Sequence, residues 1–238
     1  MTTRIVRVVS VLALVFGGAA CGSDGDSDST TTAPSNSSTA ATTTPESTAT
    51  TAPSTSVPAD TEQAIWPFAD GDRYDTPEAA AQSFAVDYLD YTETSLGEFA
   101  AGDDRSGEIE VRAGEGLAAF TTVMLRQLSD DTWWVIGAVS PDIQPTTPAS
   151  DATITSPVSL TGSSLAFESN VNVEIRVVDS VEPIVTDFVM GGSMELGPYA
   201  KDIEFADPGV ERGVILMRVL SMKDGGCEAA TVTRVRFG

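Results

Sequence analysis

The apolar positions between residues 77 and 91 recur at helical spacing. They form one stripe, whose members are Ala81, Phe84, Ala85, Tyr88, Leu89 and Tyr91. Thr76 suits the N-cap, Pro77 the first turn and Glu78 the positive end of the helix dipole. The pattern therefore predicts an amphipathic helix over residues 77–91, with this stripe against a core.

Alternating apolar and polar positions begin after residue 107 and predict strands. Residues 96–107 are rich in Gly and Asp, which is typical of a loop. The segment "EIEVR" then places Ile109 and Val111 on one face. Residues 121–128 and 133–140 predict two further strands, and the turn "SDDT" between them indicates a hairpin. One helix on this antiparallel sheet gives an α+β fold.

Neighbouring residues of a strand point to opposite faces, so Trp133 and Trp134 are expected on opposite sides. Strict alternation groups Trp134 with Ile136 and Ala138, and Trp133 with Val135 and Val139. A strand that is apolar on both faces is covered on both. The helix supplies one cover. The other is a loop, a ligand or the following domain, and we expect the following domain.

Residues 150–238 read as all-β. The segment "SNVNVEIRVVDS" alternates strictly, which predicts Val171, Val173, Ile175 and Val177 inward and Asn172, Glu174 and Arg176 outward. About seven strands separated by Gly, Pro and Asp turns predict a two-sheet sandwich. The stretch from Pro141 to Pro148 divides it from the α+β domain, which we assign to residues 65–145.

The chain opens with the features of an export signal. Arg4 and Arg7 precede an apolar run, and small residues lead to Cys21. We therefore predict a signal peptide over residues 1–20. The segment "GAAC" resembles a bacterial lipobox, which implies lipid attachment to Cys21 and membrane anchoring; ordinary secretion after cleavage at Ala20 is the alternative.

Residues 21–64 are dominated by Ser and Thr and contain very few large apolar side chains. Such a segment buries too little surface to offset the entropy of ordering its backbone. We therefore expect a disordered tether between the lipid and the folded part. The protein would then be extracytoplasmic and held to the cell membrane.

Charge and composition exclude several classes of function. The chain has 35 acidic and 13 basic residues, and loss of Arg4 and Arg7 with the signal would leave a formal charge of −24. That charge repels phosphate backbones, so we expect no nucleic acid partner. There is no histidine, which removes Ser-His-Asp and Cys-His catalysis. No cofactor or metal site is predicted.

The carboxylates Asp103, Asp104 and Glu108 are the best candidates for an acid–base pair. Their Gly-rich surroundings indicate a solvated loop, so we predict no catalytic residues and no enzyme. Cys227 is the only cysteine after Cys21, and we expect it as an unpaired, partly buried small residue.

The C-terminal half resembles a known family. The segments "ITSPVSLTGSSLAFESNVNVEIRV", "FVMGGS" and "GVILMRVLSMKDG" are similar to the bacterial spore germination immunoglobulin-like domain, here in what resembles an actinobacterial-type envelope lipoprotein. The resemblance implies an extracytoplasmic β-sandwich without catalytic residues. Within it, Gly162 and Gly192 are expected to permit turns, Pro157 to break a strand and Phe167 to fill the core.

Two functions follow from these patterns. The first is a monomeric, non-catalytic lipoprotein of the cell envelope whose immunoglobulin-like module binds a partner protein or a cell-wall polymer. The second is a small-ligand carrier or sensor with a pocket in the α+β domain. Aromatic side chains suit a pocket wall, so its candidate binding residues are Trp133, Trp134 and Tyr88.

Overall fold

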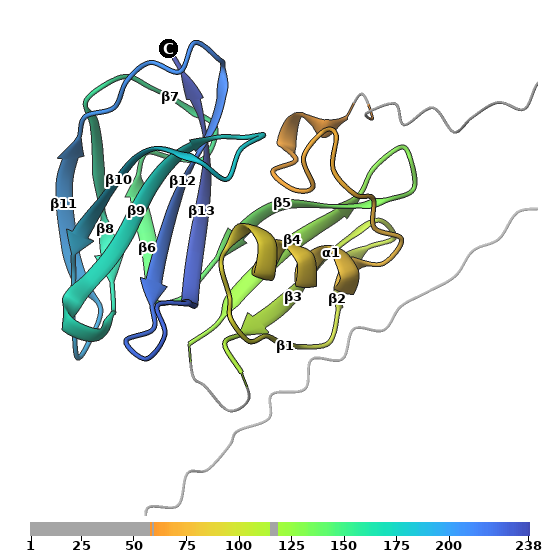
Figure 1. Cartoon of the computed structure of the whole chain (residues 1–238), viewed down its shortest axis with the longest axis horizontal. Helices are drawn as coiled ribbons and strands as arrows, with labels where there is room; N and C mark the ends of the chain where they lie inside the picture. The colour runs from red at the N-terminus through yellow and green to blue at the C-terminus, as the bar shows by residue number, and fades with distance from the viewer. Residues whose placement is uncertain (1–57, 59, 115–118) are drawn as a thin grey trace, which may run out of the picture. The chain divides into compact units, whose positions relative to one another are not determined.

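The structure is a computed structural model that describes residue 58 and residues 60–114 and 119–238 (Figure 1). The predicted signal peptide, Cys21 and nearly all of the predicted tether lie outside these residues. Within the described part, no helix is long and apolar enough to cross a membrane. The fold is a small α+β unit followed by an immunoglobulin-like sandwich, as predicted.

The predicted helix is confirmed, with a change in its last turn. It runs as α1 (Pro77–Ser83) and continues as the π-helical segment η2 (Phe84–Tyr88). The side-chain oxygen of Thr76 accepts a hydrogen bond from the Ala79 amide at 3.2 Å, which is the expected N-cap. The helix ends at Tyr88 instead of Tyr91, and Asp90 follows in the left-handed region with φ 64°.

Five strands form the sheet below this helix. They are β1 (Ser95–Leu96), β2 (Ala100–Asp103), β3 (Ser106–Arg112), β4 (Thr121–Gln127) and β5 (Trp133–Val139). The hairpin β4–β5 is confirmed, but the prediction of a loop over residues 96–107 is wrong, because β1 and β2 both pair with β3. Every residue of β2 is exposed, so this strand has no apolar alternation to reveal it.

A β-bulge at Ile136 changes the faces of β5. Met124 pairs with Gly137 and Leu125 with Val135, so Ile136 is the extra residue. Ala138 therefore joins Trp133 in the core under α1, and Val139 is 44% exposed. The faces predicted for these two residues are wrong, because strict alternation does not allow for the bulge.

The sandwich consists of eight strands. They are β6 (Ile143–Thr147), β7 (Ala152–Ile154), β8 (Val158–Ser164), β9 (Asn170–Val177), β10 (Pro183–Met190), β11 (Gly197–Ile203), β12 (Arg212–Leu220) and β13 (Cys227–Phe237). The small sheet has the order β11-β8-β6. Strand β6 lies in the stretch that the sequence indicated as a divider, and it pairs with β8 through Ile143 and Ser164.

The large sheet continues from the sandwich into the α+β unit. Its order is β1-β3-β4-β5-β13-β12-β9-β10, and β13 meets β5 at the pair Val232 and Ala138. Strand β12 has a core on each side: Val214 packs with the helix, and Ile215 packs between the sandwich sheets. Burial on both faces explains why this strand is apolar almost throughout.

Four expectations for the sandwich need correction. Glu174 and Arg176 are buried, 6% and 3% exposed, because the end of η2 covers this face of β9. Phe167 is 67% exposed and fills no core. Gly162 lies inside β8, not in a turn, and a Cβ there would stand 2.4 Å from the Gln144 carbonyl oxygen. Its role is close packing of strands.

Candidate binding face

Helix α1 lies across one face of the β3–β5 sheet (Figure 1) and packs against its buried side chains. The opposite face carries side chains that are exposed or half-buried, while the alternate residues of β3 and β4 are buried. Its members are Glu108, Glu110, Thr122, Met124, Arg126, Ile136 and Val139. We call this surface the open face.

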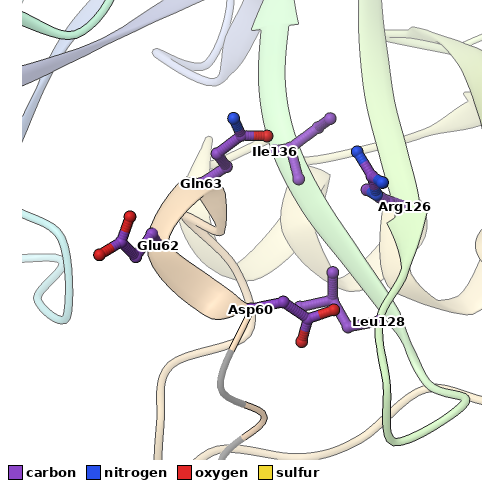
Figure 2. A pocket seen from close by; sticks show the side chains of 6 residues that line it. All are labelled: Asp60, Glu62, Gln63, Arg126, Leu128 and Ile136. Carbon is purple, nitrogen blue, oxygen red and sulfur yellow. The ribbon is translucent and has the colours of Figure 1, made fainter.

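A hollow of about 280 Å³ lies at one end of the open face, beside the 3₁₀ turn η1 (Thr61–Gln63). It is lined by Asp60, Glu62, Gln63, Arg126, Leu128 and Ile136. Figure 2 shows Arg126 and Ile136 extending from the neighbouring strands β4 and β5, with Gln63 opposite Ile136. Among the described residues, the structure shows no ion pair for Arg126.

The turn beside this hollow is anchored from two sides. The Ser129 hydroxyl donates to the Asp60 carboxylate at 3.0 Å. From β12, the Arg212 guanidinium donates to the Thr61 and Ala64 carbonyls at 3.2 and 2.7 Å. These bonds hold the wall in place, so the hollow is shaped before any ligand arrives.

A second hollow of about 390 Å³ lies at the other end of the open face, where β5 meets the sandwich. Its lining is Met124, Gly137, Val139, Ser140, Ile143, Gln144, Pro145, Thr146, Pro148, Ala149, Ser150, Thr231, Val232, Thr233 and Arg234. A Cβ on Gly137 would lie 2.5 Å from the Met124 methyl carbon. Glycine at this position therefore keeps room for the Met124 side chain along the floor.

Polar groups fix the walls of the second hollow. Arg234 donates from Nε and Nη2 to the two carboxylate oxygens of Asp151 at 2.9 and 2.7 Å, and also to the Ile136 carbonyl. These hydrogen bonds hold the pKa of Asp151 below its usual value. The Thr231 hydroxyl accepts from the Ser140 amide at 2.9 Å and donates to the Ile143 carbonyl at 2.8 Å. The site is therefore rigid and remains polar near neutral pH.

The aromatic residues predicted as a pocket wall occupy two separate places. Tyr88 and Trp133 lie in the core under α1, where Tyr88 stacks on Phe84 with ring centroids 5.0 Å apart. Burial raises the pKa of Tyr88 to about 12. Trp134 lies on the opposite face of β5. None of the three lines either of the two hollows.

A loop covers part of the face of β5 that points away from helix α1. Trp134 packs with Ala64 and Leu128, and the Arg73 guanidinium lies 4.6 Å above its ring. The indole N–H donates to the Thr132 hydroxyl at 2.9 Å. The expectation that the following domain covers this side is therefore wrong for Trp134, because the chain before α1 folds back onto it.

The candidate acid–base carboxylates are solvent-exposed. Asp103, Asp104 and Glu108 are all on the surface. Asp103 accepts a hydrogen bond from the Arg105 amide at 2.8 Å, and this bond lowers its pKa. A general acid would need a raised pKa. Within the described ranges, no three His, Cys, Asp or Glu side chains gather as metal ligands would.

A buried cluster of charges joins the end of the helix to the sandwich. Arg176 and Arg218 both form ion pairs with Glu174. Nε of Arg176 donates to the Glu174 carboxylate at 2.7 Å. Arg176 also donates to the Tyr88 carbonyl at 3.2 Å, and Arg218 to the Leu89 carbonyl at 3.1 Å. Cationic groups at the last carbonyls of a helix satisfy those acceptors and complement its dipole.

The comparisons with known proteins agree with the C-terminal architecture. No curated protein and no solved structure matches the chain. One family model matches residues 142–226, which contain β6 to β12. The predicted resemblance is confirmed over this range: residues 142–226 match the family described as the immunoglobulin-like domain of bacterial spore germination.

Proposed function

We propose that the protein is a non-catalytic binding protein of the cell envelope, and that its open face holds a hydroxyl-rich cell-wall polymer. The observation that carries this proposal is the pair of hollows in series along one sheet face. Side chains of the β4–β5 hairpin line both hollows. A chain-like ligand with repeating units can occupy them in succession.

The lining of the two hollows suits a ligand that both donates and accepts hydrogen bonds. Hydroxyls come from Ser140, Ser150 and Thr233, and amides from Gln63 and Gln144. Met124, Ile136 and Val139 add apolar contact between these polar groups. Ligand sites generally combine apolar walls with a few polar groups that fix orientation.

Open hollows favour a polymer over a carried small molecule. Ligand-binding pockets typically bury 70–90% of a small ligand's surface. Both hollows here lie along an exposed sheet face. The net negative charge also disfavours strongly anionic polymers and nucleic acid, so the polymer that fits is close to neutral.

The place of action follows from the N-terminal sequence. We propose that lipid on Cys21 holds the protein outside the cytoplasm at the membrane, and that it acts there as a monomer. Replacement of Cys21 by Ser should move the protein from the membrane fraction to the soluble fraction of lysed cells. Unchanged membrane fractionation would contradict the anchor; cleavage after Ala20 with free release would support ordinary secretion.

Co-sedimentation of the full chain with purified insoluble cell wall tests the binding proposal. Val139→Glu should reduce the bound fraction severalfold, because it places a charge in the wall of the second hollow. Val86→Glu is the matched control, since Val86 is 42% exposed on the helix and Val139 is 44% exposed on the open face.

A second pair of variants tests whether the Arg126 guanidinium, which lines the first hollow, contacts the polymer. Arg126→Ala should weaken sedimentation with the cell wall, whereas Arg236→Ala, which removes an exposed guanidinium from the C-terminal strand, should not. Equal binding by all four variants would refute the open face as the site. Binding to soluble disaccharide units as strong as to the polymer would instead support a small-ligand carrier.

A further inference from the structure

One end of the sandwich carries an exposed apolar surface. Of the ten large apolar side chains exposed in the described part of the chain, six lie here: Phe167, Phe188, Met190, Met194, Leu196 and Met222. We call this surface the methionine end. Met194 is 92% exposed and Met222 is 71% exposed. Large exposed apolar patches on soluble proteins commonly mark interaction sites.

Backbone contacts place the segments that carry these side chains at the same end of the sandwich. The Gly191 amide donates to the Ser169 carbonyl at 2.9 Å, which places the end of β10 beside the turn that carries Phe167. Met190 pairs with Asn170 at the start of β9. Strand β12 runs alongside β9 towards the same end, and Met222 follows in the turn after it.

The loop between β10 and β11 is tightly closed, which presents Met194 and Leu196 at its tip. A Cβ on Gly192 would lie 1.8 Å from the Glu195 carbonyl oxygen and 2.6 Å from the Gly197 amide nitrogen. Only glycine allows this approach. Both side chains of this closed loop are exposed, Leu196 to 44%.

The backbone beside Phe167 is in a rare conformation. Glu168 and Ser169 have φ values of 56° and 65°, both in the left-handed region that non-glycine residues seldom adopt. Two such residues in succession cost free energy, and strain of this kind concentrates at functional sites. Here the strained residues follow Phe167, whose side chain is exposed to solvent although the core of the sandwich lies nearby.

The charges around the methionine end indicate the kind of partner. Three carboxylates, Glu168, Glu195 and Asp224, are exposed beside it, against one exposed lysine, Lys223, next to Met222. Lys201 is already paired with Asp187 at 2.5 Å. The strong negative charge of the whole chain opposes a second copy and an anionic membrane. We propose that the methionine end binds a protein segment that combines apolar side chains with positive charge.

The side chains suit such a partner physically. Methionine is unbranched and has three rotatable side-chain bonds, so its surface adapts to different apolar shapes. Acidic groups around the patch steer a basic segment towards it and raise the association rate. None of the six side chains of this surface lines either hollow proposed for the polymer, so variants at the methionine end test the second proposal separately.

Titration of the full chain with a synthetic amphipathic peptide of Leu and Lys tests the proposal, with heat or fluorescence anisotropy as the readout. The peptide should bind, and added salt should weaken it. A peptide with Glu in place of every Lys should not bind. Equal binding of both peptides would overturn the proposal, as would stronger binding to anionic vesicles than to the Lys peptide.

Met194→Asp separates apolar contact from simple charge attraction. The new carboxylate alone would strengthen binding of the Lys peptide, whereas loss of the apolar contact should weaken it at least tenfold. Val181→Asp is the control, since Val181 is 41% exposed in the β9–β10 turn at the opposite end of the sandwich. Unchanged or tighter binding by Met194→Asp would refute the methionine end as the site.

Discussion

The guanidinium of Arg218 contacts the carboxylate of Asp90 at 2.5 Å, although 128 residues separate them in the chain. Asp90 follows the helix, and Arg218 belongs to β12. This pair, with the carbonyl of Leu89 beside it, fixes the end of the helix on the sheet of the sandwich. The contact between the α+β unit and the immunoglobulin-like domain therefore includes an ion pair whose arginine is buried.

Glu174→Gln should strongly destabilise the protein. Glu174 is the shared partner of Arg176 and Arg218, so its neutralisation removes the counter-charge of the buried Arg176 and leaves Arg218 with Asp90, whose side chain is largely exposed. Removing one partner of a buried ion pair typically costs about 3–5 kcal/mol. Urea unfolding at pH 7 measures this cost. Glu110→Gln, at the exposed pair with Arg112, should cost less than about 1 kcal/mol, and similar losses for both would contradict the buried cluster.

Stability should fall as pH rises above 9. Burial raises the pKa of the Cys227 thiol from an ordinary value near 9 to about 12. Between these values the unfolded chain binds fewer protons than the folded one, so the free energy of unfolding decreases as pH rises. The stabilisation is complete below pH 9 and is lost towards pH 12.

Urea unfolding at pH 8 and pH 10.5 checks this prediction in a Cys21→Ser background, where Cys227 is the only thiol. A Cys227→Ala variant should show a smaller pH dependence than its parent. Equal pH dependence of stability in the variant and its parent would show that the Cys227 thiol contributes nothing to it. In the same background, the folded protein should react with a thiol reagent at pH 8 only after urea is added.

Lys201→Gln should promote self-association through β10. This strand is the outer strand of the large sheet. The Phe188 amide donates to the Asp187 carboxylate at 2.8 Å, and the Phe188 carbonyl accepts from Lys201 at 3.0 Å. These bonds occupy backbone groups that could otherwise pair with another chain. Sedimentation velocity over a range of concentrations measures the effect, with Lys223→Gln as the control. A monomer at every concentration would count against this role.

Gly162→Ala should destabilise the sandwich by about 1–3 kcal/mol, the usual cost of overpacking. The added carbon would lie 2.4 Å from both the Gln144 carbonyl oxygen and the Tyr199 hydroxyl oxygen, and the backbone atom cannot move without disturbing β6. Gly102→Ala in β2 meets nothing closer than 3.6 Å and should be close to neutral. Chemical denaturation compares the free energies of unfolding of the two variants. Equal values would disprove the close packing around Gly162.

The elements with regular periodicity were predictable from sequence. The N-cap at Thr76 and the β4–β5 hairpin depend on neighbours in the chain, so local pattern identifies them. Strand β9 alternates in sequence because Val171, Val173 and Ile175 pack between the two sheets. Their order in the sheets depends on distant contacts, and no local pattern encodes it.

The missed features depend on contacts between distant segments. Glu174 and Arg176 alternate with apolar residues whether solvent or the end of a helix covers them, so the sequence pattern is the same in both cases. The bulge at Ile136 leaves no mark in the composition. The hollows of the open face take their walls from segments spread between residues 60 and 234, which no single motif contains.

Strand β13 has neighbours on both sides: β12 on one, and β5 and β7 on the other. Among the described strands it is also the last in chain order. Until residues 227–237 have been synthesised, the earlier strands lack the partner that unites them in a single sheet. The growing polypeptide therefore cannot complete this sheet until all twelve earlier described strands have been made and β13 has emerged to join them.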